Sequence, residues 1–241
     1  MRGWPTQEVH THPELYRAIL NRILTGELAP GQRLVEEELA RTHAVSRTPV
    51  REILFALQKD GLVERVKNKG ARVVAFTADD VEELFDIRKA LEVSCIPNAV
   101  ITVKLKDLLE LDRRLKALAS LKGAQLRKEQ CDIDLQLHKL IVHNAGNRRL
   151  ISLMGSLSTL VNALQLASYR LVERADQSVA EHHAIVRAML QRDAELTQKL
   201  LAAHIDNGKR NALEFLLGFS RGGRTVQVPV REEETAARAN F

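Results

Sequence analysis

Two patterns of apolar residues divide the chain. Up to about residue 76 short helical repeats precede alternating apolar and polar residues, and from there to about residue 219 the repeat is helical throughout. The later helices are expected at 81–93, 104–121, 126–144, 148–171, 178–191 and 194–219. Pro97 is expected to bend or end the first of these helices, because proline lacks the N–H that a helix interior needs. The predicted fold is mainly α.

A short amphipathic helix is predicted within 45–74, where apolar residues recur at helical spacing. Ser46 is a good N-cap, and Asp60-Gly61 is expected to end the helix, because glycine tolerates the left-handed conformation found at helix ends. The exposed N-terminal end of this helix carries three polar residues: Arg47, Thr48 and Arg51. Basic side chains at a helix tip are typical of proteins that bind DNA.

A basic hairpin is predicted after this helix. Residues 62–66 and 72–74 alternate as two strands around a turn that contains Lys67, Lys69 and Gly70. Two helices precede the segment, at 13–25 and 35–41, with Arg33 in a short extended piece between them. This order of elements indicates a winged helix-turn-helix that reads DNA. The alternative is a solvated helix with a charged hairpin, and the order of the elements favours the former.

Charge adds only a local signal. The chain has 241 residues, 45% of them hydrophobic and only 4% aromatic, and a net charge of +5, so its total charge does not require a nucleic acid partner. The stretch 65–72, however, contributes four positive charges and no negative one. Three glutamates at 36–38 are expected to favour the positive end of the helix dipole.

Cysteine usage and hydropathy point to a cytoplasmic protein without a membrane partner. Cys95 and Cys131 have no metal-like spacing and are expected to be small buried residues. No apolar run approaches the ~20 residues that span a membrane. The expected organisation is a flexible arm at 1–11, a winged helix-turn-helix at 12–76, an all-helical bundle at 77–220 and a disordered polar tail at 221–241.

Four polar residues of the helical part stand where a bundle would otherwise place apolar ones. Asp134 and His138 are four residues apart and share a helix face, whereas His182 and His204 fall on apolar faces of two later helices. His183 is rotated about 100° away from His182, toward solvent. A carboxylate and three imidazoles that converge would form a metal site with open positions, although each residue alone could simply be a well-paired core or surface residue.

The N-terminal motifs resemble the DNA-binding domain of GntR-family transcription regulators. The resemblance covers 13–76 and rests on the runs G-E-L-A-P-G from Gly26, V-S-R-T-P-V-R-E from Val45 and D-G-L-V from Asp60. It implies DNA contacts from Arg33, Ser46, Arg47, Thr48, Arg51, Lys67, Lys69 and Gly70. The chain departs from the family pattern at Ala44 and at the acidic run 36–38, where some relatives place an arginine on DNA.

The helical part resembles the FCD effector domain of the FadR branch of that family. The pattern is D-x-x-x-H, then E-H-x-x-I, then a histidine 22 residues after the second histidine. The resemblance implies that Asp134, His138, His182 and His204 bind a divalent metal of the zinc, nickel or manganese class. Arg88, in the family's R-x-x-x-E, is either an effector-binding residue or part of a surface ion pair with Glu92.

The implied function is that of a ligand-responsive transcription regulator, and not of an enzyme. The resemblance implies a homodimer on a palindromic double-stranded operator, with a small organic acid as effector. Two alternatives stay open: a regulator for which the metal itself is the signal, and a metal-dependent hydrolase. The hydrolase is disfavoured because no second carboxylate is placed as an obvious general base and an enzyme does not need a DNA-reading head.

Overall fold

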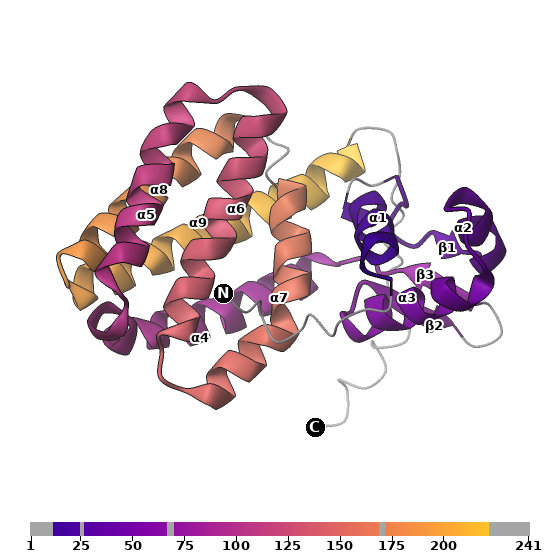
Figure 1. Ribbon diagram of the computed structural model, residues 1–241, viewed down its shortest axis with the longest axis horizontal. Helices are drawn as coiled ribbons and strands as arrows, with labels where there is room; N and C mark the ends of the chain where they lie inside the picture. Colours follow the sequence, from indigo (N-terminus) through magenta and orange to yellow (C-terminus); the bar gives the residue numbers. More distant parts are fainter. Residues whose placement is uncertain (1–11, 25–26, 67–69, 169–171, 222–241) are drawn as a thin grey trace.

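The computed structural model describes residues 12–24, 27–66, 70–168 and 172–221. It consists of a small N-terminal group of helices and strands, called the head below, and a larger helical bundle beside it (Figure 1). The predicted mainly helical fold with an N-terminal winged helix-turn-helix is confirmed. The expected arm and tail lie outside the described residues, except that Arg221 is the last residue of the final helix.

The head contains three helices and one antiparallel sheet. Its elements are α1 (Pro13–Leu24), β1 (Arg33–Leu34), α2 (Glu36–Thr42), α3 (Arg47–Lys59), β2 (Val63–Val66) and β3 (Gly70–Val73). The strand order is β1-β3-β2, with Arg33 opposite Arg72 on one side of β3 and Val63 opposite Val73 on the other. The predicted hairpin is therefore present, and the short extended piece before α2 is its third strand.

Apolar side chains from every helix and strand of the head meet in one core, which includes Ile19, Val50 and Leu57. Ser46 occupies the N-cap position of α3 as predicted, but its side chain makes no capping hydrogen bond. Gly61 follows the end of α3 with a φ of +74°, the left-handed conformation expected there. A Cβ at Gly61 would lie 2.9 Å from Leu160 of the bundle, so the head and the bundle are in close contact at this point.

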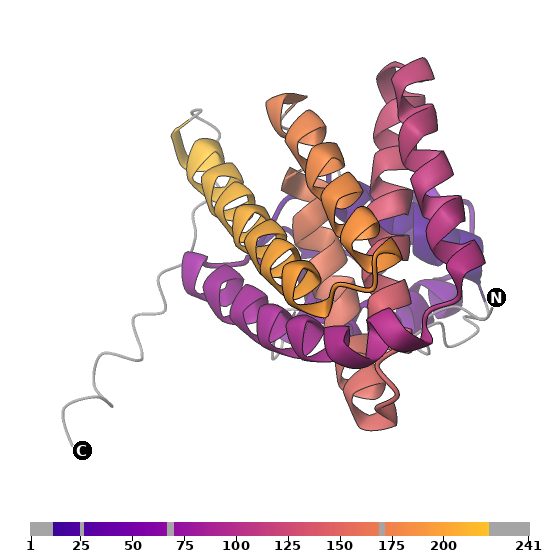
Figure 2. The ribbon, with the colours of Figure 1, turned by 90° about the vertical axis from the view of Figure 1, so that its left-hand side faces the viewer.

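The bundle is built from six α-helices and one short 3-10 helix. They are α4 (Ala78–Thr102), α5 (Leu105–Ala117), η1 (Leu118–Ser120), α6 (Gly123–His143), α7 (Arg148–Ser168), α8 (Val172–Leu190) and α9 (Ala194–Arg221). α4 packs along α9, and α8 lies between α9 and α5 (Figure 2). A capping box of Thr77 and Asp80 starts α4. Among the described residues, no helix is both long and apolar enough to cross a bilayer.

Pro97 was expected to bend or end its helix, and α4 does not end there but continues through Pro97 to Thr102. A proline inside a helix leaves the carbonyl four residues earlier without its usual N–H partner. That carbonyl belongs to Val93, and the side-chain amide of Gln198 on α9 donates a hydrogen bond to it at 3.3 Å. A tertiary contact from α9 therefore supplies the donor that the sequence of α4 lacks.

Candidate functional site

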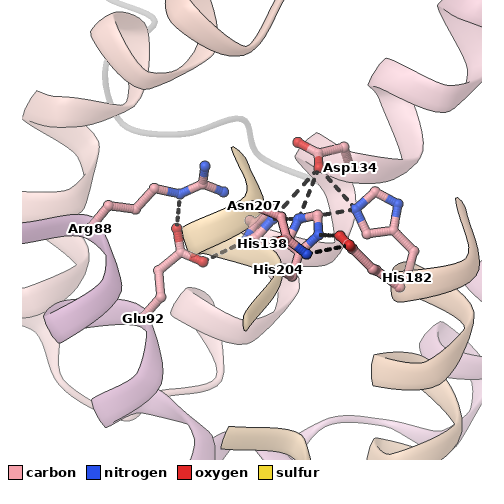
Figure 3. A network of polar contacts seen from close by, with 8 residues as sticks. Arg88, Glu92, Asp134, His138, His182, His204 and Asn207 are labelled. Atoms are coloured by element: carbon pink, nitrogen blue, oxygen red, sulfur yellow. Dashed lines mark hydrogen bonds and ion pairs between the residues drawn. The ribbon is translucent and has the colours of Figure 1, made fainter. Parts of the chain in front are cut away.

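The bundle encloses a cluster of four polar side chains, called the His3Asp cluster below. It consists of Asp134 and His138 on α6, His182 on α8 and His204 on α9 (Figure 3). All four residues are buried, and their ligand atoms lie within 4.8 Å of one another. α8 packs against both α6 and α9, and this arrangement brings together residues that are up to 70 positions apart in the sequence.

The spacing of the ligand atoms fits a single metal ion. Asp134 Oδ1 lies 2.9 Å from His182 Nε2, 3.5 Å from His204 Nε2 and 3.6 Å from His138 Nε2. His204 Nε2 lies 3.2 Å from His138 Nε2 and 3.3 Å from His182 Nε2. With bonds of about 2.1 Å, neighbouring ligands are about 3.4 Å apart around a tetrahedral ion and about 3.0 Å apart around an octahedral ion. The observed separations bracket both values.

Two carboxylates orient two of the imidazoles from behind. Glu92 on α4 accepts a hydrogen bond from Nδ1 of His138, and Glu181 on α8 accepts one from Nδ1 of His204 at 2.7 Å. An ionised carboxylate only accepts hydrogen bonds, so each Nδ1 must carry the proton. In the neutral rings both Nε2 atoms are then acceptors. Their lone pairs face each other across 3.2 Å, an arrangement that a cation between them would stabilise.

Each orienting carboxylate is itself held by other side chains. Burial raises the pKa of Glu92, but Arg88, whose Nε donates to it at 2.7 Å, and His138 outweigh burial and lower that pKa to about 2. Burial likewise raises the pKa of Glu181, whereas His204 and Asn207 lower it, with a net decrease. Asn207 Nδ2 donates to Glu181 at 2.6 Å. Both carboxylates are therefore ionised at neutral pH.

The pKa shifts of the cluster residues also show that positive charge is favoured within the cluster. Burial raises the pKa of Asp134, but the three histidines outweigh burial and hold that pKa well below its ordinary value. Burial lowers the pKa of His204, but hydrogen bonds to Asp134 and Glu181 raise it above its ordinary value. Burial lowers the pKa of His182 to about 4, so this imidazole is neutral at pH 7, the form that ligates metals.

Arg88 is not part of a surface ion pair. Its side chain is 2% exposed, and its partner Glu92 is 1% exposed. Glu92 uses one carboxylate oxygen for Arg88 and the other for His138, which links the arginine to the His3Asp cluster (Figure 3). The sequence pattern predicted the pairing of Glu92 with Arg88, but neither the bond of Glu92 to His138 nor that of Glu181 to His204. Both glutamates stand in the quoted motifs, which was the available signal.

Other candidate residues lie outside the cluster. His183 is partly exposed, and its Nδ1 is 4.0 Å from Asp112, on the side of α8 facing α5. Cys95 is buried and Cys131 half-buried, and burial raises the pKa of each thiol to about 12. The two cysteines are thus protonated at neutral pH, and neither belongs to the cluster.

The head presents its candidate DNA-binding residues on its surface. The described members of that set are all exposed: Arg33, Ser46, Arg47, Thr48, Arg51 and Gly70. Lys67 and Lys69 lie outside the described residues. A cavity of about 670 Å³ opens between α2, the start of α3 and the sheet, and Arg33, Arg47 and Arg65 line it. Glu36 and Glu37 line the same cavity, so arginines and carboxylates lie together where the recognition helix meets the sheet.

A helix-turn-helix head joined to a helical domain with a buried polar site defines a DNA-binding regulator with a ligand domain. Family models agree: residues 11–73 match bacterial regulatory proteins of the gntR family, and residues 83–207 match the FCD domain. The chain therefore belongs to the GntR family and carries an FCD domain. Members of this family regulate transcription by binding DNA operators, and the class is regulatory rather than enzymatic.

Relatives and solved structures share this architecture. The transcriptional regulator YdhC of Bacillus subtilis is 26% identical over 195 residues, which cover 80% of this chain and 87% of that protein. The structure of McbR/YncC from E. coli is similar, with a TM-score of 0.67 at 22% identity over 84% of this chain and 96% of that chain. The Zn²⁺-bound FCD domain of TM0439 covers 60% of this chain and 99% of its own, with a TM-score of 0.50 at 24% identity.

Proposed function

We propose that this protein is a metal-containing, effector-responsive regulator of the FadR subfamily. The His3Asp cluster holds a divalent metal ion, and a small organic acid binds beside it in the bundle. Binding of the acid then changes the affinity of the head for its operator. The protein acts as a homodimer, so that two heads read a palindromic site.

The observation that carries the metal assignment is the pair of facing imidazole nitrogens. His138 Nε2 and His204 Nε2 are 3.2 Å apart, and the carboxylates behind them fix both as acceptors in the neutral rings. Three imidazoles with one carboxylate suit the zinc, nickel or manganese class. When bound, the metal supplies a Lewis acid with positions left for a ligand, and a carboxylate is a suitable occupant.

Two buried groups beside the cluster support an acidic, hydrogen-bonding effector. The Nε of Arg88 is engaged by Glu92, while its two terminal nitrogens make no hydrogen bond with a described residue and can bind a carboxylate. Gln130 lies one turn before Asp134 on α6, and its buried Oε1 has no hydrogen-bond partner among the described residues. A hydroxyl of the effector would satisfy that acceptor.

The proposal is tested by adding organic acids to metal-stripped and metal-loaded protein. Thermal stabilisation by an acid should require the metal, because the carboxylate occupies a position on it. Equal stabilisation of the stripped protein would contradict this placement. Mass spectrometry of the natively purified protein identifies a co-purifying acid. If metal alone releases the stripped protein from operator DNA, the metal itself is the signal.

Arg51→Ala should lower affinity for the operator about 5- to 150-fold, the effect of losing one good base or phosphate contact. The operator can be recovered by selection from genomic fragments, and binding measured by fluorescence anisotropy at fixed salt. Arg17→Ala is the matched control, since Arg17 is an exposed arginine on α1 that pairs with Glu14. Equal affinity of the two variants would refute the reading role of α3.

The full-length protein should sediment as a dimer at micromolar concentration without DNA. Exposed apolar side chains occur on the bundle at Ile87, Ile101, Leu105 and Leu109, and burial of apolar surface drives association. Analytical ultracentrifugation over a range of concentrations measures the state directly. A clean monomer at all concentrations would exclude the dimer on a palindromic site.

A further inference from the structure

Two arginines of the recognition helix are already held by carboxylates of the protein itself. Glu37 Oε2 on α2 lies 2.7 Å from Arg47 Nη2, and Glu36 Oε2 lies 2.6 Å from Arg51 Nε. α2 packs against α3, so these pairs join the two helices of the helix-turn-helix. The helix dipole does account for acidic residues in the first turn of α2, but it does not require that they reach these arginines.

Both ion pairs face the surface on which DNA would lie. The arginine side chains are 58% and 64% exposed, so water, salt or phosphate can reach them. Glu36, Glu37 and Arg47 also line the cavity beside the sheet, together with Arg33 and Arg65. Within the described part of the chain, Arg33 and Arg65 form no ion pair. DNA that approaches this face therefore meets two unpaired arginines and two that already have a carboxylate partner.

We propose that Glu36 and Glu37 act as intramolecular counterions that DNA phosphates must displace before Arg47 and Arg51 can bind. The head then binds every duplex less tightly than its arginines would allow, which keeps sequence-independent binding low. The inference rests on the proposed contact of Arg47 and Arg51 with DNA. It concerns α2, which no part of the proposed function uses.

The expected size of the effect follows from the exposure of the pairs. An exposed ion pair changes an equilibrium by about 1.4- to 5-fold. If two heads of a dimer bind one duplex, the effects in the two heads multiply, so the change in affinity is the square of that factor. When a DNA phosphate replaces the glutamate at an arginine, the glutamate carboxylate is left unpaired in water. Salt weakens the original ion pair between glutamate and arginine by screening it. The cost of the exchange is therefore greatest at low salt and fades as the salt concentration rises.

The test compares Glu37→Gln with Glu38→Gln on a labelled duplex of arbitrary sequence, with affinity measured by fluorescence anisotropy from about 50 to 200 mM salt. Glu38 is adjacent, is also exposed and has no ion-pair partner among the described residues, so its variant reports the simple loss of one negative charge. Glu37→Gln should bind more tightly than Glu38→Gln by about 1.4- to 5-fold per head, with the larger difference at low salt. Glu36→Gln should change affinity in the same direction.

A second comparison isolates the ion pair. In an Arg47→Gln background, Glu37→Gln should increase the affinity for DNA no more than Glu38→Gln does, because the ion-pair partner of Glu37 is absent. Equal affinities of Glu37→Gln and Glu38→Gln in the wild-type background would overturn the proposal. So would weaker binding by Glu37→Gln, which would mean that the carboxylate positions Arg47 for DNA.

Binding of DNA by the Arg47→Gln variant distinguishes failure of the counterion role from failure of the proposed DNA contact. If wild-type protein binds DNA and Arg47→Gln weakens binding, Arg47 contacts DNA as proposed. Failure of the glutamate comparison then overturns the counterion role alone. If Arg47→Gln leaves binding unchanged at low salt, both the proposed contact and the inference are wrong.

Discussion

His182→Ala is expected to lose most of its bound metal, whereas His183→Ala is expected to keep it. His182 is buried in the His3Asp cluster, with Nε2 2.9 Å from Asp134 and 3.3 Å from His204. Removal of a residue that only hydrogen-bonds to a metal ligand lowers metal affinity about 10- to 100-fold. Removal of His182, a ligand itself, should lower metal affinity by more than that. His183 points elsewhere, toward Asp112 at 4.0 Å. Metal analysis of the purified variants by plasma mass spectrometry measures the difference.

The two adjacent histidines provide a matched pair. The substitution is the same, the helix is the same, and only the face of α8 differs. Operator binding by the head should change little in either variant without effector, because the cluster lies in the bundle. Circular dichroism confirms that each variant is folded. Equal metal loss in both variants, or loss in His183→Ala alone, would show that the cluster does not hold the metal as proposed.

Helical periodicity placed the four cluster residues on inward faces of their helices, but each of them could still have been an ordinary core or surface residue. Asp134 and His138 are four residues apart, and His182 lies on the apolar face of its helix, so the register of each helix placed them inward. Their convergence depends on how α6, α8 and α9 pack, which periodicity within one helix does not determine. The motif resemblance supplied that step, because it links residues on three helices.

The contacts that sequence analysis missed are those made between elements. Glu92 and His138 are 46 residues apart, and their bond exists because α4 packs against α6. Val93 and Gln198 are 105 residues apart, so the donor that satisfies the Val93 carbonyl could not be found within α4. In each case the side chain was visible in the sequence, but its partner was fixed by packing.

In the head, too, the contacts that the sequence did not predict are those between different elements. The run at 36–38 was interpreted through the dipole of its own helix and as a departure from the family pattern, and neither interpretation predicted that Glu36 and Glu37 reach across to α3. The strand β1 is only two residues long and exists through its pairing with β3. The sequence predicted an extended piece at Arg33 but not its pairing with β3, since a two-residue strand carries no periodicity.

Glu92→Gln is expected to destabilise the bundle and to weaken metal binding as well. The pair of Arg88 and Glu92 is almost fully buried, and removal of one partner from a buried ion pair costs about 3–5 kcal/mol, because it leaves the other charge unpaired. Glu92 uses its two oxygens for two donors, Arg88 and His138. A glutamine offers only one oxygen, so its amide nitrogen must face one of those donors. Chemical denaturation of the metal-free protein measures the loss.

Metal affinity should fall about 10- to 100-fold in the same variant, because the ring of His138 is no longer held by a carboxylate. The surface pair of Glu110 and Arg113 provides the control, and Glu110→Gln should leave both the denaturation midpoint and the metal affinity near wild type. A competition assay with a chromophoric chelator measures affinity separately from stability. A Glu92→Gln protein as stable as the Glu110→Gln protein would show that the buried pair contributes little.

The double variant Arg88→Met with Glu92→Leu separates the two effects. It removes both buried charges, and apolar replacement of a buried ion pair is often neutral or stabilising, so the denaturation midpoint should return toward wild type. Nδ1 of His138 would still lack its acceptor, and metal affinity should therefore stay low. Recovery of metal affinity together with stability would show that Glu92 matters to the site only through the packing of α4. Recovery of stability alone would assign to Glu92 the orientation of the His138 ligand.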